Sequence, residues 1–265
     1  MHNSAPTRIS WLDGQLRETP LIPGDNRGFL VGLGVFETLK VTDSHPEFLE
    51  RHINRLVEST QRIDVSLHDG IDMGAAVAEV IAANQDIAVS ARLRITVTAQ
   101  GSTSSILISM AELEPYPETT SCIVVPWARN ERSPLSGVKS TSYAENVIAL
   151  NWARKAGYSE AIFCDSVGRL SEGATTNIFV VLNGEVLTPS TSSGLLPGVI
   201  RGVLLEAKLA KEADLLPEHL KSAEEIFLTS STRGVHPVSR INDRVFESVG
   251  QATQQTLKRF KSLQK

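Results

Sequence analysis

The chain has 265 residues, of which 41% are hydrophobic and 21% charged, and this length suffices for one large domain or two modest ones. The net charge of −4 gives no electrostatic basis for binding nucleic acid or an anionic membrane. No apolar run approaches the roughly 20 residues that span a bilayer, and residues 1–14 lack a signal-peptide pattern. Cys122 and Cys164 lie in apolar runs and are interpreted as buried thiols, so we expect a cytoplasmic protein.

The first part of the chain mixes strand and helix signals. Asp13 and Gly14 supply the turn of a predicted hairpin. The strand prediction at 91–99 rests on strict alternation of apolar and polar residues. In chain order we expect a hairpin at 8–16, a glycine-punctuated strand at 28–41, helices near 48–63 and 71–84, and strands at 91–99 and 104–113.

The second part of the chain has more strands than a regular alternation of strands and crossover helices would have. The predicted elements are strands at 121–127, 160–164, 176–182, 185–189 and 225–230, and helices after Lys139, from Pro197 and near 246–262. This pattern predicts an α+β fold with two domains. The predicted division is a small N-terminal domain at 1–115, a proline-containing linker at 116–125 and a larger domain at 126–265.

Several familiar motifs are absent. Gly32 and Gly34 begin like a dinucleotide fingerprint, but Glu37 stands at the third glycine position and the context reads as a strand. The histidines and cysteines show no metal-ligand spacing, so we expect no metal. Residues 136–139 match S-x-x-K with Ser136 as a possible nucleophile, although the companion motifs of the penicillin-recognising enzymes are missing.

Lys139 stands out because the pattern places it at the entrance of a helix, where the positive end of the helix dipole disfavours a cation. The neutral, nucleophilic form of the amine would be favoured there. Elsewhere, Arg55 lies on a predicted helix and Glu172 precedes a strand. The Pro-Gly helix start leaves the amides of Val199 and Ile200 to face an anion.

Each of these features has an ordinary structural interpretation when taken alone. Arg55 reads as a solvated helix residue, Glu172 as a surface carboxylate, and the hydroxyl run 229–232 as a turn. Taken together they match the needs of pyridoxal phosphate. This cofactor requires a lysine, an acid opposite the pyridine nitrogen and a set of phosphate ligands.

The sequence resembles the class IV pyridoxal-phosphate enzymes of fold type IV over essentially its whole length. The matching segments are 25–41, 51–56, 137–163, 170–189, 195–202 and 226–238. The resemblance implies a two-domain α+β fold, with a small N-terminal α/β domain and a larger C-terminal barrel-like mixed domain. It implies pyridoxal 5'-phosphate as cofactor, a small-molecule substrate and a homodimer.

The resemblance also implies roles for individual residues. Lys139 is the Schiff-base lysine, Glu172 is the acid at the pyridine nitrogen, and Arg55 is a phosphate ligand. The other implied cofactor contacts are the amides of Val199 and Ile200, the hydroxyls of Ser230, Ser231 or Thr232, and the side chains of Tyr143 and Asn177.

Within the family, the run from Lys139 to Val147 looks most like the 4-amino-4-deoxychorismate lyases. Branched-chain aminotransferases typically carry a tyrosine five residues after the lysine, whereas Tyr143 comes four residues after it. D-amino-acid transaminases use an Arg-x-His pair, which the region 97–105 lacks. The sequence departs from the family's usual G-D-G at Leu33, which affects what can be said of the substrate end of the site.

The leading hypothesis is therefore a lyase that forms 4-aminobenzoate and pyruvate on the folate route. Lys139 would act as general base and Thr38 would protonate the departing enolpyruvate, while Arg92 and Arg94 could bind carboxylates. The first alternative is an aminotransferase for small amino acids of the branched-chain or D-amino-acid type. Two others are an acyl-serine hydrolase that uses Ser136 and a cofactor-binding protein without turnover.

Overall fold

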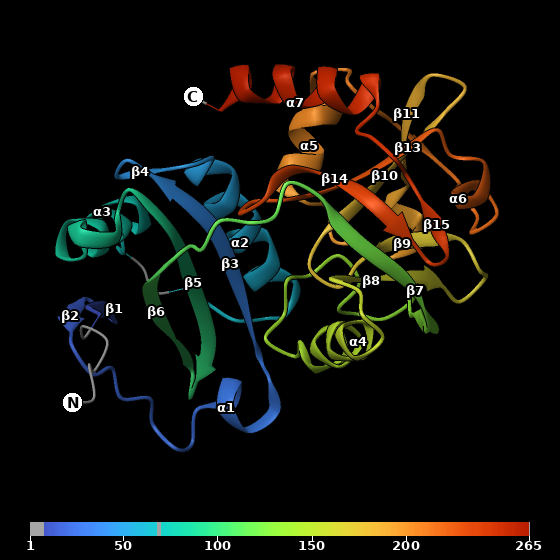
Figure 1. The fold of residues 1–265 in the computed structure, drawn as a ribbon. Helices are drawn as coiled ribbons and strands as arrows, with labels where there is room; N and C mark the ends of the chain where they lie inside the picture. Colours follow the sequence, from blue (N-terminus) through green and yellow to red (C-terminus); the bar gives the residue numbers. More distant parts are fainter. Residues whose placement is uncertain (1–7, 68–69, 265) are drawn as a thin grey trace. The chain divides into compact units, whose positions relative to one another are not determined.

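The computed structural model describes residues 8–67 and 70–264 (Figure 1). The chain divides into two units by its internal contacts. Unit 1 contains the residues up to Glu114 and the short segment Val138–Ser142, and unit 2 contains Pro115–Gly137 and the residues from Tyr143 onward. Lys139 thus belongs to unit 1, although the division predicted from the sequence placed it in the larger domain.

Unit 1 is a 6-stranded sheet with the strand order β2-β1-β6-β5-β3-β4. The strands are β1 (Ser10–Leu12), β2 (Gln15–Arg17), β3 (Gly34–Thr42), β4 (His45–Pro46), β5 (Ser90–Gln100) and β6 (Thr103–Glu112). The helices are α1 (Arg27–Val31), α2 (Leu49–Arg62), α3 (Met73–Ala83) and the 3₁₀ turn η1 (Gln85–Ile87). The predicted hairpin is confirmed, because Leu12 pairs with Gln15 across Asp13 and Gly14.

Strand alternation separates the two faces of this sheet. The face that packs on α2 and α3 is apolar except at Glu37, with Val35, Leu39, Leu93 and Ile95 all 0% exposed. Because neighbouring side chains of a strand point to opposite faces, Phe36 and Thr38 lie on the other face of β3. Thr38 stands directly opposite Arg94 on β5, so this second face is polar and basic.

The segment Val138–Ser142 joins unit 1 through the start of β3. Phe36 N donates to Lys139 O at 2.8 Å, and Thr141 N donates to Gly34 O at 2.9 Å. The hydroxyl of Thr141 also donates to Gly32 O at 2.7 Å. Gly32 has φ 68° and ends α1, and a Cβ there would lie 2.4 Å from the Ser142 hydroxyl, so only glycine fits.

Unit 2 is built on a 9-stranded sheet. Its main path runs β12-β11-β10-β13-β14-β7-β8-β9, and β15 pairs with β14. The strands are β7 (Thr120–Arg129), β8 (Glu160–Asp165), β9 (Leu170–Gly173), β10 (Asn177–Leu182), β11 (Glu185–Pro189), β12 (Lys211–Ala213), β13 (Glu225–Ser230), β14 (Gly234–Ile241) and β15 (Arg244–Val245). The helices are α4 (Ala144–Lys155), α5 (Val199–Glu206), α6 (His219–Ser222), α7 (Gln251–Leu263) and the 3₁₀ turn η2 (Thr191–Ser193).

The core of unit 2 centres on β10 and β13. Phe179 and Phe227 are fully buried and stack with ring centroids 4.7 Å apart. The register places Asn177 opposite Thr229 at the end of this pair, next to the segments predicted to contact the cofactor. The hydrophobic pairing of two strands therefore determines where two polar strand ends meet.

The structure differs from the predicted elements at several places, and three of them are informative. The strand predicted at 28–41 begins only at Gly34, because Asn26 caps a short helix through the Phe29 amide. β7 begins at Thr120, inside the range predicted as a linker. β14 was not predicted, since Pro237 in its middle is unusual for a strand.

Candidate active site

The aromatic ring of Phe36 brings two of the predicted site residues together in unit 1. The Lys139 Nζ lies 4.5 Å from the ring centroid, and the Arg94 guanidinium carbon lies 3.6 Å from it. Arg94 Nε also donates to the Thr96 hydroxyl at 3.0 Å. The ring thus holds an amine and a guanidinium close to each other through cation–π contacts.

Two other predicted residues lie on the same face of the unit 1 sheet. Thr38 is half-buried opposite Arg94, so its hydroxyl belongs to the group around Phe36. Arg92 is exposed and stands opposite Lys40, one step further along the strands. The Phe36 ring therefore links Arg94 to Lys139, Thr38 is linked only through its pairing with Arg94, and Arg92 lies one pair further along.

Arg55 is not a solvated helix residue. Its Nε and Nη2 donate to the two carboxylate oxygens of Glu37, each at 2.7 Å. The Nδ1 of His52 lies 2.7 Å from Glu37 Oε2. Because an ionised carboxylate only accepts hydrogen bonds, His52 donates from Nδ1. Glu37 and His52 are 0% exposed, in the layer between β3 and α2.

The charges of this cluster follow from its burial and its contacts. Burial alone would raise the pKa of Glu37, but Arg55 and His52 outweigh it and lower the pKa to about 2. Burial lowers the pKa of His52, and the attraction of Glu37 offsets this only in part. At neutral pH the cluster therefore contains a carboxylate, a guanidinium and a neutral imidazole.

Unit 2 contains the predicted acid, Glu172, on β9. The Leu196 amide donates to Glu172 Oε2 at 3.0 Å, and Arg129 Nη2 lies 3.4 Å from Oε1. The side-chain amide of Asn177 donates to Leu196 O at 2.9 Å. Glu172 and Asn177 thus hold the two backbone groups of one residue, and this fixes the loop that leads into α5.

Tyr143 lies next to this group. Its hydroxyl donates to Ala174 O at 2.7 Å, and the side-chain amide of Asn146 donates to the same oxygen at 2.8 Å. Burial raises the pKa of Tyr143, and the negative charges of Glu172 and Glu160 raise it further. Tyr143 is therefore a neutral hydrogen-bond donor across the physiological pH range.

The start of α5 is held close to Asn177. The helix begins at Val199 after Gly198, and no side chain among the described residues caps its first amides. A Cβ at Gly198 would lie 2.0 Å from Asn177 Oδ1, so the close approach requires glycine. The side chains of Val199 and Ile200 are both buried.

The turn between β13 and β14 contains the predicted hydroxyl ligands. Ser230, Ser231 and Thr232 are all half-buried. The Arg233 amide donates to the Ser230 hydroxyl at 3.2 Å, and the hydroxyls of Tyr116 and Thr232 are 3.0 Å apart. Since Asn177 pairs with Thr229, this turn follows directly from the strand end beside the α5 loop.

Sequence reasoning missed three polar residues at these sites. Glu37 and His52 support Arg55, and Arg129 contacts Glu172. Glu37 could have been found, because a carboxylate among alternating apolar strand residues requires a buried partner. Arg129 has no such signal, since it ends a strand whose last residues are not consistently buried.

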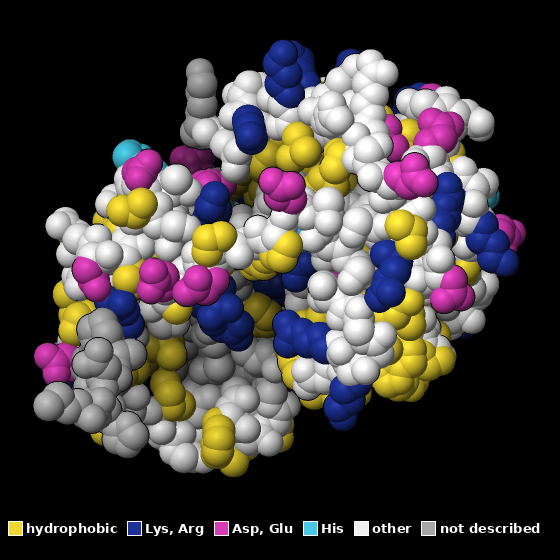
Figure 2. Space-filling view, viewed as in Figure 1, with side chains coloured by type: hydrophobic (Ala, Val, Ile, Leu, Met, Phe, Trp, Pro, Cys, Tyr) yellow, Lys and Arg dark blue, Asp and Glu magenta, His cyan; other side chains and the backbone are white. Residues whose placement is uncertain are grey.

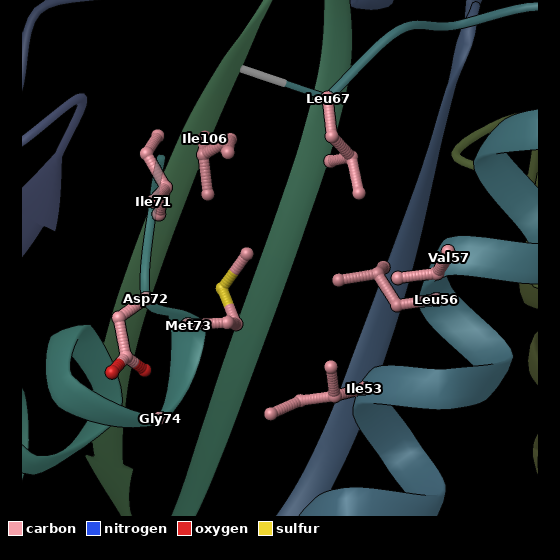
Figure 3. Close-up of a pocket in the computed structure, with 9 residues that line it drawn as sticks. All are labelled: Ile53, Leu56, Val57, Leu67, Ile71, Asp72, Met73, Gly74 and Ile106. Carbon is pink, nitrogen blue, oxygen red and sulfur yellow. The ribbon is translucent and has the colours of Figure 1, made fainter. Parts of the chain in front are cut away.

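A hydrophobic cavity of about 290 Å³ in unit 1 contains none of the predicted site residues. It lies between α2 and α3, and Ile53 of α2 and Met73 of α3 line it from different sides (Figure 3). Figure 2 shows hydrophobic side chains gathered over α4 and the end of β7, where Trp127, Val147 and Ile148 are exposed. Apart from Asp72, the side chains that line the cavity are apolar, and none of them belongs to the predicted site. No helix in the described ranges is both long enough and apolar enough to cross a membrane.

Comparison with known proteins identifies the family. The family model for amino-transferases of class IV matches residues 34–241, so the chain belongs to this family. A Methanocaldococcus jannaschii protein provisionally named a branched-chain-amino-acid aminotransferase is 31% identical, over 90% of this chain and 89% of its own. The aminodeoxychorismate lyase of Bacillus subtilis is 27% identical, over 89% of this chain and 87% of its own.

The fold is that of the fold type IV pyridoxal-phosphate enzymes. A branched-chain aminotransferase structure from Thermoproteus uzoniensis superposes with a TM-score of 0.88 at 25% identity, and covers 97% of this chain and 95% of its own. Because the class IV family depends on pyridoxal phosphate, the chain is a pyridoxal-phosphate-dependent enzyme. The relatives bear the names of both aminotransferases and lyases, so the reaction is not decided by similarity.

The residues of unit 2 fit this cofactor on their own chemistry. Arg129 Nε and the Thr229 hydroxyl are buried without a hydrogen-bond partner among the residues that the structure describes. They accompany an acid and an uncapped helix start, which are the groups that a pyridine nitrogen and a phosphate require. The donor set therefore suits a ligand with one basic ring nitrogen and one anionic end.

Two glycines of the α5 region allow a matched test of the close approach. We expect Gly198→Ala to destabilise unit 2 by about 1–3 kcal/mol, because the new methyl group would overlap Asn177. Gly202→Ala, in the same helix, has space at 4.0 Å from Glu206 and should be neutral or stabilising by up to about 1 kcal/mol. Urea unfolding of the two variants measures the difference, and equal stabilities would contradict the packing argument.

The lowered pKa of Glu37 predicts an acid-dependent loss of stability. The unfolded carboxyl takes up a proton near its ordinary pKa of 4.5, whereas the folded one stays ionised down to about 2. The contribution is therefore complete above pH 4.5 and disappears as pH falls toward 2, for a total of about 3 kcal/mol. Urea unfolding between pH 6 and pH 3 should show a smaller acid loss for Glu37→Gln than for the wild type. Parallel pH profiles would refute the assignment.

Proposed function

We propose that the protein is a lyase that converts 4-amino-4-deoxychorismate to 4-aminobenzoate and pyruvate. The observation that carries the proposal is the sharing of the Phe36 ring by Lys139 and Arg94. An amine that can remove a proton lies beside a guanidinium that can bind a carboxylate. The substrate has an amine-bearing ring carbon and two carboxylates, and this arrangement suits both features.

The proposal assigns the cofactor contacts as follows. Glu172 accepts a hydrogen bond from the pyridine nitrogen, and Lys139 forms the covalent attachment. Asn177 and Tyr143 orient the loop segments around the ring, through Leu196 and Ala174. The proposed phosphate ligands are the Arg55 side chain, the amides of Val199 and Ile200, and the hydroxyls of Ser230, Ser231 or Thr232.

Pyridoxal phosphate, when bound, supplies an electron-accepting ring that stabilises negative charge on the carbon beside the substrate nitrogen. Lys139 Nζ removes the proton from the ring carbon that bears the amine. The carbon–oxygen bond to the enolpyruvyl group then breaks, and the ring becomes aromatic. Thr38 Oγ1 delivers a proton to the methylene carbon of the departing enolpyruvate, which yields pyruvate, and regains the proton that Lys139 removed. Arg94 holds a substrate carboxylate during these steps, with Arg92 as a second, exposed cation at the margin.

A second candidate function is an aminotransferase for small amino acids. It is favoured by the relatives named as branched-chain aminotransferases, among them a Salmonella typhimurium enzyme that is 28% identical over 80% of this chain and 77% of its own. The same lysine and the same cofactor would serve this reaction. The short spacing from Lys139 to Tyr143 supports the lyase instead.

Further parts of the proposal concern the setting of the enzyme. We expect a homodimer in the cytoplasm that acts on the folate route, by analogy with related enzymes. The rival use of Ser136 as an acyl-serine nucleophile is disfavoured by the match to the class IV amino-transferase family.

Replacement of Lys139 tests the proposed attachment site. Lys139→Ala removes the amine proposed for covalent attachment together with the general base, which alone is worth about 10²–10⁴-fold. We expect activity near background and an intact fold. Borohydride reduction of the wild type should attach the cofactor to the peptide that contains Lys139. Lys155→Ala, an exposed change in α4, serves as the control, and labelling of Lys40 or Lys155 would disprove the site.

Product analysis tests the proposed reaction against the aminotransferase. Purified protein is incubated with 4-amino-4-deoxychorismate, and separately with small amino acids and 2-oxoglutarate. We expect 4-aminobenzoate and pyruvate in equal amounts from the first mixture and little glutamate from the second. Rapid glutamate formation without 4-aminobenzoate would overturn the lyase proposal in favour of the aminotransferase.

A further inference from the structure

Glu37 and His52 form a buried polar cluster with Arg55, and the proposed function gives neither Glu37 nor His52 a role. Glu37 stands in the row of β3 residues that faces the core, between Val35 and Leu39, which are both 0% exposed. A carboxylate in such a row is costly unless its hydrogen bonds are satisfied. Both oxygens of the Glu37 carboxylate accept hydrogen bonds from residues of α2, so the cluster joins β3 to α2 by polar contacts.

The geometry of the cluster constrains Arg55 more strongly than a single ion pair would. Two parallel hydrogen bonds, each of 2.7 Å, join Nε and Nη2 of Arg55 to the two oxygens of Glu37. A bidentate pair of this kind fixes the plane and the direction of the guanidinium. His52 in turn holds Oε2 of Glu37 at 2.7 Å, so the carboxylate cannot rotate without breaking a buried bond.

We infer that Glu37 is a positioning residue for Arg55 as a ligand of the cofactor phosphate, and that His52 keeps the Glu37 carboxylate in place. The inference rests on the proposed assignment of Arg55 to the phosphate. Arginine is a long side chain that loses much rotamer freedom when it binds a ligand. A clamp that is present before the cofactor arrives removes most of that loss, and so increases affinity for a phosphate monoester.

The charge of the cluster allows two effects of a Glu37 substitution on phosphate affinity to be distinguished: loss of the clamp on Arg55, and a change in Coulomb attraction. Glu37 is ionised, Arg55 is positive and His52 is neutral, so the cluster has no net charge near pH 7. Replacement of Glu37 by glutamine leaves Arg55 with an uncompensated positive charge. Coulomb attraction alone would then make a phosphate bind more tightly. Loss of the clamp would make it bind more weakly, so the direction of the change decides between the two.

The experiment compares pyridoxal phosphate with pyridoxal, which lacks the phosphate. Cofactor is removed from the purified protein, and each compound is titrated back while its absorbance is followed. We expect Glu37→Gln to weaken binding of pyridoxal phosphate by about 10-fold or more, with no change for pyridoxal. The variant Glu37→Gln with Arg55→Gln should bind no more weakly than Arg55→Gln alone, because the two residues act as one unit.

The control is Glu47→Gln. Glu47 is another carboxylate of unit 1, half-buried, and it contacts Thr42 and Lys40 at the far end of β3. This change should leave the affinity for both compounds as in the wild type. If Glu37→Gln does not fold, Glu37→Asp replaces it. The aspartate keeps the charge but is one methylene shorter, so we expect it to weaken binding of pyridoxal phosphate in the same selective way.

Each other result overturns the inference for a different reason. Tighter or unchanged binding of pyridoxal phosphate by Glu37→Gln, with weaker binding by Arg55→Gln, would show that Arg55 binds the phosphate without needing the clamp. Equal weakening for both compounds would show a general loosening of unit 1. No effect of Arg55→Gln would remove Arg55 from the phosphate. Failure of the proposed lyase reaction is separate, because these titrations measure cofactor binding and not product.

Discussion

The pairing of the segment around Lys139 with the start of β3 is the constraint on which the proposed chemistry depends. Two backbone hydrogen bonds set the register between Lys139–Thr141 and Gly34–Phe36. In this register the lysine side chain reaches the Phe36 ring, which also holds Arg94. The chain on both sides of this short segment belongs to unit 2. The hydrogen bonds to β3 are therefore what attach the lysine to unit 1.

Both units contain buried carboxylates, and the contacts of each carboxylate determine the direction of its pKa shift. Glu37 is in direct contact with two basic side chains, and its pKa is lowered. Glu160 on β8 is equally buried, and burial raises its pKa. Arg233 Nη2 lies 3.6 Å from Glu160, and its attraction does not offset the effect of burial. In unit 2, Glu172 and Asn177 bind the same loop residue, Leu196, which links the proposed acid to the start of α5.

The sequence allowed much of this protein to be predicted because its signals are local. The alternation at 91–99 predicted β5, and the turn at Asp13 and Gly14 predicted the first hairpin. The motif segments were specific enough to identify the family and its cofactor, and the family model confirms both. The roles of the individual site residues remain predictions. The structure shows that the side chains of Glu172 and Asn177 both hydrogen-bond the backbone of Leu196.

What the sequence determined by itself was the kind of residue at each point: an isolated lysine, an acid before a strand, a glycine-led helix start. Tertiary structure decided their partners. The sequence placed Lys139 at a helix entrance, but α4 begins only at Ala144 and Lys139 instead pairs with β3. Taken alone, Arg55 read as a solvated helix residue, but two hydrogen bonds to the buried Glu37 carboxylate hold its guanidinium. Both outcomes depend on contacts between residues far apart in the chain, and hydrophobic periodicity along one segment contains no information about such contacts.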